Sequence, residues 1–514
     1  MAGPTGAGPT GAERAAAPLG VAAVDLGATS GRVMLGVLEE GRIDLVPAHR
    51  FENRLVERGG HLSWDLDALW AEIRQGLADA HDLALVRGLP GLASIGVDSW
   101  AVDYGFVGPD GDEGDGALLG EVVAYRDSRT DGVAERVTQQ VSRERQFALT
   151  GIAQQPFNTA YQLAAEDRLT DLPEGSTLLL VPDLVGFLLT GRRRTERTNA
   201  STTGLLAADG EDWKDELLDA VGADRSLFAP LIHPGDQLGT VRPELAERLG
   251  IGEVPVIAVG SHDTASAVLA VPSPGTGPVA YISSGTWSLI GLELDAPVLT
   301  EEAREAGFTN EGGVGGTVRL LKNVAGMWLV SESIRQWEED GAHVDLADLL
   351  EAAAAVPGDR FRIDPTDPDF LAPGRMADRV TAAARPLAGE DEAPRTPAQL
   401  VRCILESLAE TYREELHAAC RLAGVPLPER LHVVGGGSRN ALLNRLTAEA
   451  LGIDVVAGPM EATALGNVAL QCRALGAIAD EPGAIRELVR SSVELEEFVP
   501  EGHEAARHVI PSAR

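Results

Sequence analysis

Two segments of similar design lie about half a chain apart, and they limit the folds open to this sequence more than any other feature. In the first, apolar residues 21–24 and 33–38 flank an acid and a turn of small residues around Gly27. In the second, at residues 279–294, two apolar stretches flank a turn of serine, threonine and Gly285. Each pattern predicts a β-hairpin with glycine at its tight turn. Their spacing of 258 residues is compatible with two similarly built domains and, equally, with two unrelated hairpins.

Elsewhere, stretches with helical periodicity alternate with short apolar runs. The periodicity predicts a helix at residues 66–77 and strands at 94–97, 178–181 and 254–259. Such alternation favours an α/β fold with a largely parallel sheet. The 514 residues are enough for two to four domains of ordinary size.

The charge of the chain excludes some classes of function. It carries 78 acidic and 43 basic residues, a formal net charge of -35. Such a surface repels phosphate backbones and anionic lipids, so we expect neither nucleic-acid binding nor membrane-surface binding. Only Lys214 and Lys322 are lysines, and neither belongs to a GxxxxGK[ST] sequence. Phosphoryl transfer through a Walker-type loop is therefore excluded.

Other features bear on cellular location. Three cysteines without C-x-x-C spacing favour a reduced, cytoplasmic protein. Residues 1–18, rich in Gly, Ala, Pro and Thr, predict a disordered tail rather than a signal peptide. The most apolar internal stretch, residues 178–190, is too short to span a bilayer and contains Pro182 and Asp183. We expect a monomer or a small homo-oligomer without membrane association.

The turn of the first hairpin combines an acid with small and hydroxyl-bearing residues. Asp25 ends the apolar run, and Ala28-Thr-Ser-Gly-Arg32 follows it. Small residues let backbone N–H groups approach an anion, and Arg32 supplies charge where lysine is absent. Asp25 could then hold Mg²⁺ on a phosphate, because hard cations bind carboxylates and phosphate oxygens together. The alternative is a hairpin whose Asp and Thr satisfy their own backbone.

Two further turns lie between a strand and a helix. After the apolar residues 431–434, Gly435-Gly-Gly-Ser438 precedes an amphipathic run at 441–451, with Ser438 as a plausible N-cap. The spacing is not GxGxxG, so it is weak support for a dinucleotide site. Asp263, in Gly260-Ser-His-Asp-Thr264, could accept a proton from a hydroxyl nucleophile or could cap the following helix, or both. The ten histidines are scattered, and we assign none to a metal.

The segment from Gly96 to Tyr104 places two carboxylates around a tryptophan, directly after a predicted strand. Asp98 and Asp103 could hydrogen-bond a polyol while the ring of Trp100 covers it. A buried tryptophan beside strand-end acids is the ordinary alternative.

In their order along the chain, these segments resemble the FGGY carbohydrate kinases, and most closely the rhamnulose kinases of that family. The resemblance covers about residues 21–477, nearly the whole chain. The strings that carry it are Asp25-Leu-Gly-Ala-Thr-Ser-Gly-Arg-Val-Met34, Ala124-Tyr-Arg-Asp-Ser-Arg-Thr130, Pro156-Phe-Asn-Thr159, Ser261-His-Asp-Thr-Ala-Ser-Ala-Val268, Ser283-Ser-Gly-Thr-Trp-Ser-Leu289, Thr309-Asn-Glu-Gly-Gly313 and Val434-Gly-Gly-Gly437.

The resemblance implies an α/β protein of two actin-like (RNase H-like) ATPase domains that face a central cleft. The disordered tail at residues 1–18 would precede an N-terminal domain at 19–272, with the sugar and phosphate contacts. A nucleotide-side domain at 279–477 and a C-terminal extension at 478–514 would follow. The implied reaction is phosphorylation of the small-molecule sugar L-rhamnulose at O1 by ATP, with Mg²⁺, in L-rhamnose degradation.

The resemblance also implies roles for single residues. Asp263 would be the proton acceptor. Ala101 stands where the family usually has glycine, which affects the fit of the sugar, and Ser331 stands where the family can have a glutamine that contacts nucleotide. Contacts to ATP are implied for Ala28, Thr29, Ser30, Gly31, Arg32, Thr286, Ser331 and Gly436, and contacts to sugar for Ala101, His262, Asp263, Thr264 and Asn323.

Three alternatives belong beside this interpretation. A kinase for another ketose, such as fuculose or xylulose, would be distinguished by a panel of ketoses assayed with ATP. An actin-like ATPase acting as a chaperone or filament would hydrolyse ATP without sugar, and would leave His262 and Asp263 without a purpose. A nicotinamide dehydrogenase rests on the turn at Gly435 alone, and it requires NAD binding.

Overall fold

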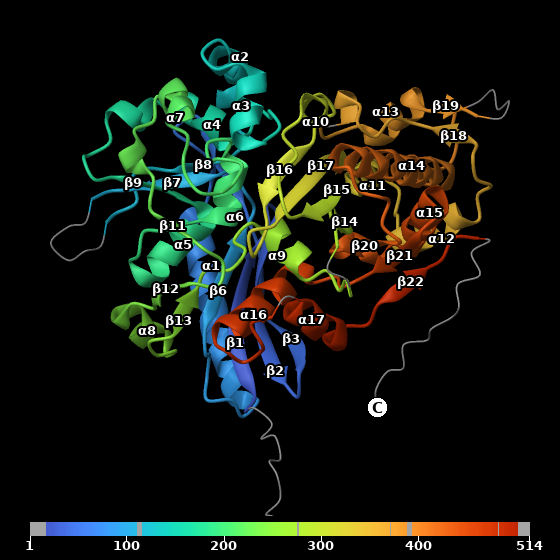
Figure 1. The fold of residues 1–514 in the computed structure, drawn as a ribbon. Coiled ribbons are helices and arrows are strands. Elements are labelled where there is room, and N and C mark those ends of the chain that lie inside the picture. Colours follow the sequence, from blue (N-terminus) through green and yellow to red (C-terminus); the bar gives the residue numbers. More distant parts are fainter. Residues whose placement is uncertain are drawn as a thin grey trace, which may run out of the picture.

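The chain folds into two halves that lie side by side (Figure 1). The computed structural model describes residues 17–109, 116–274, 277–370, 372–387, 393–481 and 483–501. Of the tail predicted at 1–18, residues 1–16 lie outside the described residues, as do 275 and 276, just before the second predicted hairpin.

The N-terminal half is built on a six-stranded sheet of order β12-β13-β6-β1-β2-β3. Strands β1, β2 and β3 form an antiparallel meander. Strand β6 pairs in parallel with β1, and β13 pairs in parallel with β6. Helix α1 (Leu66–Val86) packs on this sheet through Leu66, Leu69, Ile73 and Leu77, a spacing that places them on one helix face. The strands are β1 (Leu19–Leu26), β2 (Ser30–Glu39), β3 (Arg42–Glu52), β6 (Ile95–Ser99), β12 (Gln237–Thr240) and β13 (Pro255–Ile257).

The C-terminal half repeats this topology in a seven-stranded sheet of order β16-β17-β15-β14-β20-β21-β22. Strands β14, β15 and β17 form the antiparallel meander, and β20 and β21 add in parallel. The shared order confirms that the two hairpins belong to similarly built domains and are not a coincidence. The strands are β14 (Val279–Ser284), β15 (Trp287–Leu294), β16 (Thr309–Gly312), β17 (Val318–Ala325), β20 (Arg430–Val434), β21 (Asp454–Ala457) and β22 (Glu496–Phe498).

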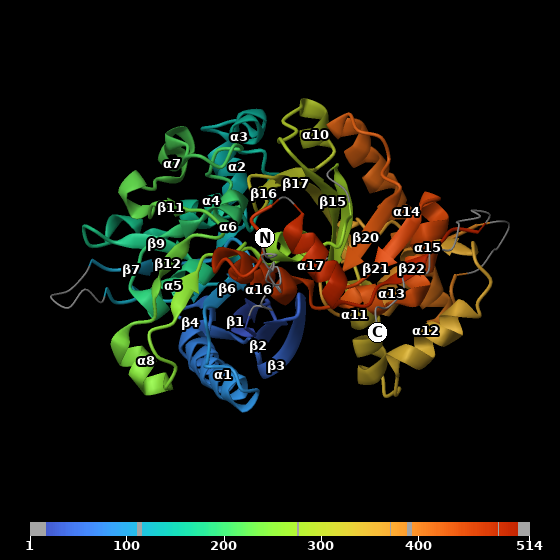
Figure 2. The same ribbon diagram turned by 60° about the horizontal axis from the view of Figure 1, so that its bottom comes forward.

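Two helices join the halves, α9 (Asp263–Leu269) and α16 (Ala462–Ala474), and both views show α16 beside β1 (Figures 1 and 2). The helices approach closely, because a Cβ on Gly466 would lie 1.9 Å from the carbonyl oxygen of Ser266. Polar contacts reinforce the junction. Asn467 Nδ2 donates to Asp98 Oδ2 (2.5 Å), and Gln471 Nε2 donates to the carbonyl oxygen of Ala22 (3.0 Å).

The remaining elements surround the two sheets. In the N-terminal half they are β4 (Leu55–Arg58), β5 (His61–Trp64), β7 (Tyr104–Val107), β8 (Val122–Val123), α2 (Val133–Thr138), α3 (Arg143–Thr150), α4 (Thr159–Ala164), β9 (Thr177–Leu180), α5 (Val181–Thr190), β10 (Thr195–Glu196), α6 (Arg197–Ala200), α7 (Asp215–Val221), β11 (Leu231–Ile232) and α8 (Pro243–Leu249). In the C-terminal half they are α10 (Glu301–Glu305), α11 (Trp328–Glu339), α12 (Leu346–Ala354), β18 (Phe361–Arg362), α13 (Met376–Ala383), β19 (Arg385–Pro386), α14 (Pro397–Ala423), α15 (Ala441–Leu451) and α17 (Ala484–Ser492).

Several sequence-based expectations need correction. Each large sheet is mixed rather than largely parallel, because each begins with a meander. The run predicted as a strand at 178–181 pairs with β7 in a separate two-stranded sheet, and helix α5 already begins at Val181. Residues 484–498, within the predicted C-terminal extension, form α17 and the edge strand β22. Among the described residues, no helix is both long and apolar enough to cross a membrane.

Candidate active site

The two hairpin turns present small, exposed residues. In the first turn, the N–H of Gly27 donates to the carbonyl oxygen of Ser30 (2.9 Å), and Thr29 and Ser30 are exposed. In the second, the N–H of Gly285 donates to the carbonyl oxygen of Trp287 (2.8 Å), and Thr286 is exposed. Hydroxyl groups and turn amides that the fold leaves open suit the oxygens of a phosphate.

The acid of the first hairpin, Asp25, is buried at the end of β1 and paired with Arg32 across the turn. Arg32 Nη2 lies 2.6 Å from Asp25 Oδ2, and Nε of the same guanidinium donates to that oxygen at 2.9 Å. The Nη1 atom of Arg32 lies 2.8 Å from Glu461 Oε2, directly before α16. The charge of Arg32 is thus largely balanced by protein carboxylates. Burial raises the pKa of Asp25, although Arg32 counteracts it.

A second acid, Asp98, stands beside Asp25 in the parallel register of β6 and β1. Burial, and then repulsion from Asp25, raise the pKa of Asp98 well above its usual 3.8, and Asp263 adds to this repulsion. Asn467 binds only Oδ2, and Asp98 Oδ1 is buried without a hydrogen-bond partner. The described residues contain no group of three or more His, Cys, Asp or Glu that could hold a metal ion by itself. Two carboxylates nevertheless fit Mg²⁺, which completes its shell with water and substrate phosphate.

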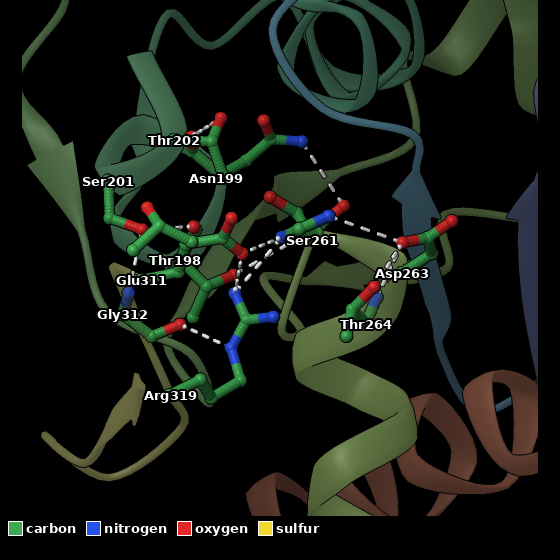
Figure 3. A network of polar contacts seen from close by, with 12 residues as sticks. Thr198, Asn199, Ser201, Thr202, Ser261, Asp263, Thr264, Glu311, Gly312 and Arg319 are labelled. Atoms are coloured by element: carbon green, nitrogen blue, oxygen red, sulfur yellow. Dashed lines mark hydrogen bonds and ion pairs between the residues drawn. The ribbon is translucent and has the colours of Figure 1, made fainter. Parts of the chain in front are cut away.

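Asp263 is the first residue of α9 and is half-buried. Figure 3 shows its carboxylate beside Thr264 at the start of this helix. Of the roles that the sequence left open for Asp263, the helix cap is not the one observed, because His262 occupies the N-cap position of α9. Asp263 Oδ1 instead accepts hydrogen bonds from the N–H of Thr264 (2.5 Å) and from Thr264 Oγ1 (3.0 Å). His262 Nε2 lies 3.4 Å from the same oxygen. Asp263 Oδ1 is therefore surrounded by donors, and Oδ2 is left for a further partner.

The loop that carries these residues is anchored by a buried acid that the sequence analysis missed. Glu196 Oε2 accepts hydrogen bonds from the N–H of Ser261 (2.9 Å) and from Ser261 Oγ (2.7 Å). Its other oxygen accepts from the N–H of Thr198 (2.8 Å). No motif marks Glu196 in the sequence, because its partner at Ser261 is 65 residues away.

The segment after β6 is fixed by Asp103, which the sequence offered as a sugar contact. Its Oδ2 accepts from the indoles of Trp64 (2.6 Å) and Trp100 (3.0 Å), and Oδ1 accepts from Gln162 Nε2 (3.1 Å). Burial raises the pKa of Asp103 to about 6 even with these donors. Asp103 therefore holds the two tryptophans and is not free for a sugar.

Ala101 and Val102 lie between Trp100 and Asp103. Ala101 is half-exposed, and Val102 has a φ of +70°, which is uncommon for a β-branched residue. The carbonyl oxygen of Val102 accepts from Thr159 Oγ1 (2.7 Å), which helps to hold this backbone. The half-exposed Ala101 is therefore presented on a fixed backbone.

In the C-terminal half, the second hairpin adjoins the start of α11 and the glycine turn after β20. The N–H of Trp328 donates to the carbonyl oxygen of Thr286 (3.0 Å), which brings the exposed Ser331 to the same region. Gly437 is needed for packing, because a Cβ there would lie 1.9 Å from Ser284 Oγ. Gly436 is exposed and has no atom within 4 Å of an added Cβ, so its bare backbone faces open space.

Helix α15 is capped by Asn440 and not by the predicted Ser438. The predicted cap Ser438 lies in a short 3₁₀ turn, and the side chain of Asn440 caps α15 by accepting from the N–H of Leu443 (3.1 Å). Asn323 is exposed on β17, opposite Leu289 of β15.

The two domains share one topology, each presents an open glycine hairpin, and an acid at a helix start lies between them. The chain belongs to the FGGY family of carbohydrate kinases. The model of its N-terminal domain matches residues 21–270, and that of its C-terminal domain matches 280–475. The α/β, two-domain fold and the class of enzyme expected from the sequence are thereby confirmed, with ATP as the co-substrate and a small-molecule sugar as the acceptor.

Particular relatives narrow the class. The chain is 44% identical to a rhamnulokinase of Bacteroides thetaiotaomicron, over 93% of this chain and 95% of that protein. It is 40% identical to a rhamnulokinase of Bacillus subtilis, again over 93% and 95%. Among solved structures, a glycerol kinase of Plasmodium falciparum with ADP has a TM-score of 0.76 at 14% identity, and a ligand-bound xylulose kinase of Lactobacillus acidophilus has 0.73 at 17%. Each of these two matches covers 94% of this chain and 94% of the chain in the solved structure. At such identity these structures show the fold alone.

Proposed function

We propose that this carbohydrate kinase transfers the γ-phosphate of ATP to O1 of L-rhamnulose, yielding L-rhamnulose 1-phosphate. The observation that carries the proposal is the identity of 39–44% to five rhamnulokinases over at least 90% of this chain. The xylulose and glycerol kinases share the fold at only 14–21% identity. Because the three buried cysteines are free and the co-substrate is ATP, we also propose a cytoplasmic location.

In the proposed mechanism, Asp263 accepts the proton of the O1 hydroxyl as that oxygen attacks the γ-phosphorus. Its Oδ1 is occupied by Thr264 and faces His262, so the free Oδ2 is the atom that takes the proton. Phosphoryl transfer needs positioning and charge neutralisation more than covalent help, which suits a site with a single base.

The phosphates of ATP would lie between the two hairpin turns. Contacts would come from Ala28, Thr29, Ser30, Gly31 and Thr286, with Arg32 contributing its charge through the pair with Asp25. Asp25 and Asp98 would hold Mg²⁺. The ion pair of Asp25 with Arg32 uses only Oδ2, and Oδ1 of Asp98 is buried without a hydrogen-bond partner. When bound, this ion neutralises phosphate charge as it develops in the transition state.

The two halves would divide the remaining contacts. We propose that residues 19–272 contribute Ala101, His262 and Thr264 to the sugar. Residues 279–477 would contribute Asn323 to the sugar and Ser331 and Gly436 to the nucleotide. The exposure of Gly436 and Ser331 near Thr286 supports the nucleotide assignment.

A panel of ketoses tests the choice of sugar. The purified protein is assayed for ADP formation with ATP and Mg²⁺, using L-rhamnulose, L-fuculose and D-xylulose in turn. We expect the highest kcat/KM with L-rhamnulose and little ADP without sugar. A higher kcat/KM with another ketose would assign that sugar instead. Equal ADP formation with and without every sugar would support the non-metabolic ATPase.

A further inference from the structure

A fully buried arginine of the C-terminal half reaches across to the helix-start segment of the N-terminal half. Arg319, on β17, has no exposed surface. Its Nη2 lies 3.0 Å from His262 Nδ1 and 3.2 Å from Glu311 Oε2, and its Nε donates to the carbonyl oxygen of Gly312 (3.1 Å). Figure 3 shows the guanidinium of Arg319 between Glu311 and the segment that carries Ser261 and Asp263.

This contact selects the tautomer of His262. An arginine side chain has only donors and stays protonated, so the Nδ1 atom that meets it must be the acceptor. A neutral imidazole that accepts at Nδ1 carries its proton on Nε2. The Nε2 atom of His262 is the one that lies 3.4 Å from Asp263 Oδ1. The arginine thus turns the N–H of the ring toward the acid.

The carboxylate of Glu311, which also lies beside this ring, would select the opposite tautomer of His262. Glu311 Oε2 lies 3.3 Å from the same Nδ1 atom, and a carboxylate there would accept a proton from it. Burial acts to raise the pKa of Glu311, but the charge of the neighbouring Arg319 counteracts burial, and the pKa is lowered from its usual value, so this carboxylate stays charged. Arg319 therefore decides between two arrangements of one ring.

We propose that Arg319, balanced by Glu311, is a positioning residue that fixes His262 as the Nε2–H tautomer and thereby holds the carboxylate of Asp263 in its catalytic orientation. With Oδ1 held by Thr264 and by the ring, Oδ2 points away from these donors. The role of Asp263 in this scheme rests on the proposed function.

The placement of the pair also ties the base to both halves of the molecule. Arg319 and Glu311 lie on β17 and β16, whereas His262 and Asp263 precede and begin α9. Burying such a pair is costly compared with apolar residues of similar size, and Nη1 of Arg319 is buried without a partner. A contact made only for stability would not need these charges.

The test reads the tautomer directly, without sugar or ATP. The full chain is labelled with ¹⁵N-histidine, the signals of His262 are assigned with His262→Gln, and the protonated nitrogen is identified by NMR at neutral pH. We expect the proton on Nε2 in the unmodified protein. A proton on Nδ1 would overturn the proposal, whichever sugar is the substrate.

Variants then test the cause. In Arg319→Met, we expect the proton to move to Nδ1, facing Glu311, and kcat to fall about 10- to 100-fold with KM for ATP unchanged. Arg319→Lys, which keeps a charged donor, should retain the Nε2–H tautomer and recover part of kcat. An unchanged tautomer or an unchanged kcat in Arg319→Met would overturn the proposal.

A matched control breaks a different Arg–Glu pair of the same half. Arg402 pairs with Glu406 within helix α14, where Nε lies 2.6 Å from Oε1 and the arginine side chain is 16% exposed. Arg402→Met should leave the tautomer of His262 and kcat unchanged. If this variant shifted both, the effect of Arg319→Met would be general destabilisation, and the proposal would fail.

Discussion

Replacing Asp263 with asparagine separates the chemical role of this residue from its structural one. Asparagine keeps an oxygen that accepts from the N–H of Thr264, now 2.5 Å from Oδ1, but it cannot take a proton from the sugar. General-base catalysis contributes roughly 10²–10⁴-fold, so kcat should fall by that factor, or about 3–5 kcal/mol of transition-state stabilisation. The free energy of unfolding should change by less than about 1 kcal/mol, the usual value of a charge at a helix N-terminus.

The chain offers a control in the same structural position. Asp215 is the first residue of α7, a helix of seven residues like α9, and it is exposed. Asp215→Asn should change stability by a similar amount and leave kcat intact. Asp263→Ala removes both oxygens, so the N–H of Thr264 loses its acceptor, and an additional cost of about 1 kcal/mol is expected.

Three measurements decide the outcome. Initial rates with ATP and L-rhamnulose give kcat, calorimetry gives the affinity for ATP, and urea denaturation gives the free energy of unfolding. The expected Asp263→Asn protein is folded, binds ATP and is nearly inactive. Turnover within threefold of the unmodified protein would refute the reasoning and leave the carboxylate a purely structural group.

Further predictions concern the metal, the glycine turn and pH. Asp25→Asn should raise the Mg²⁺ concentration for half-maximal activity while circular dichroism stays unchanged, and an unaltered Mg²⁺ requirement would count against the metal role. Gly437→Ala should lower the melting temperature because its Cβ meets Ser284, whereas Gly436→Ala should raise KM for ATP at unchanged melting temperature. Burial raises the pKa of Asp103 from 3.8 to about 6, so its contribution to stability is present below pH 4 and is lost as pH rises through 6. Relative to the unmodified protein, Asp103→Asn should therefore gain about 3 kcal/mol in unfolding free energy between pH 4 and 7, and parallel urea-derived curves would exclude this titration.

The hairpins were predictable because their signals are local. An apolar run, a turn with Gly27 or Gly285 and a second apolar run specify the structure within about twenty residues. The boundary between β9 and α5 could not be predicted, because both elements are buried and their apolar residues form one continuous run. Periodicity cannot separate a buried strand from a buried helix, and only Pro182 in the first turn of α5 marks the change.

The residues of the site also divide into those that the sequence could indicate and those that it could not. Asp263 could be singled out because it follows a strand and opens a helix, although its exact position there was off by one residue. Arg319 and Glu196 could not be singled out from the sequence, because each contacts the segment around His262 from more than 50 residues away. A single buried charge carries no local pattern, and its partners become known only when the tertiary structure is known.

The product of the reaction tests the proposed activity most directly. L-rhamnulose labelled with ¹³C at C1 is incubated with ATP, Mg²⁺ and the protein, and the product is examined by ¹³C and ³¹P NMR. We expect one phosphate per ADP formed, with coupling between phosphorus and C1. ADP formed without phosphorylated sugar, or phosphate on a carbon other than C1, would contradict a kinase that acts on O1 of L-rhamnulose.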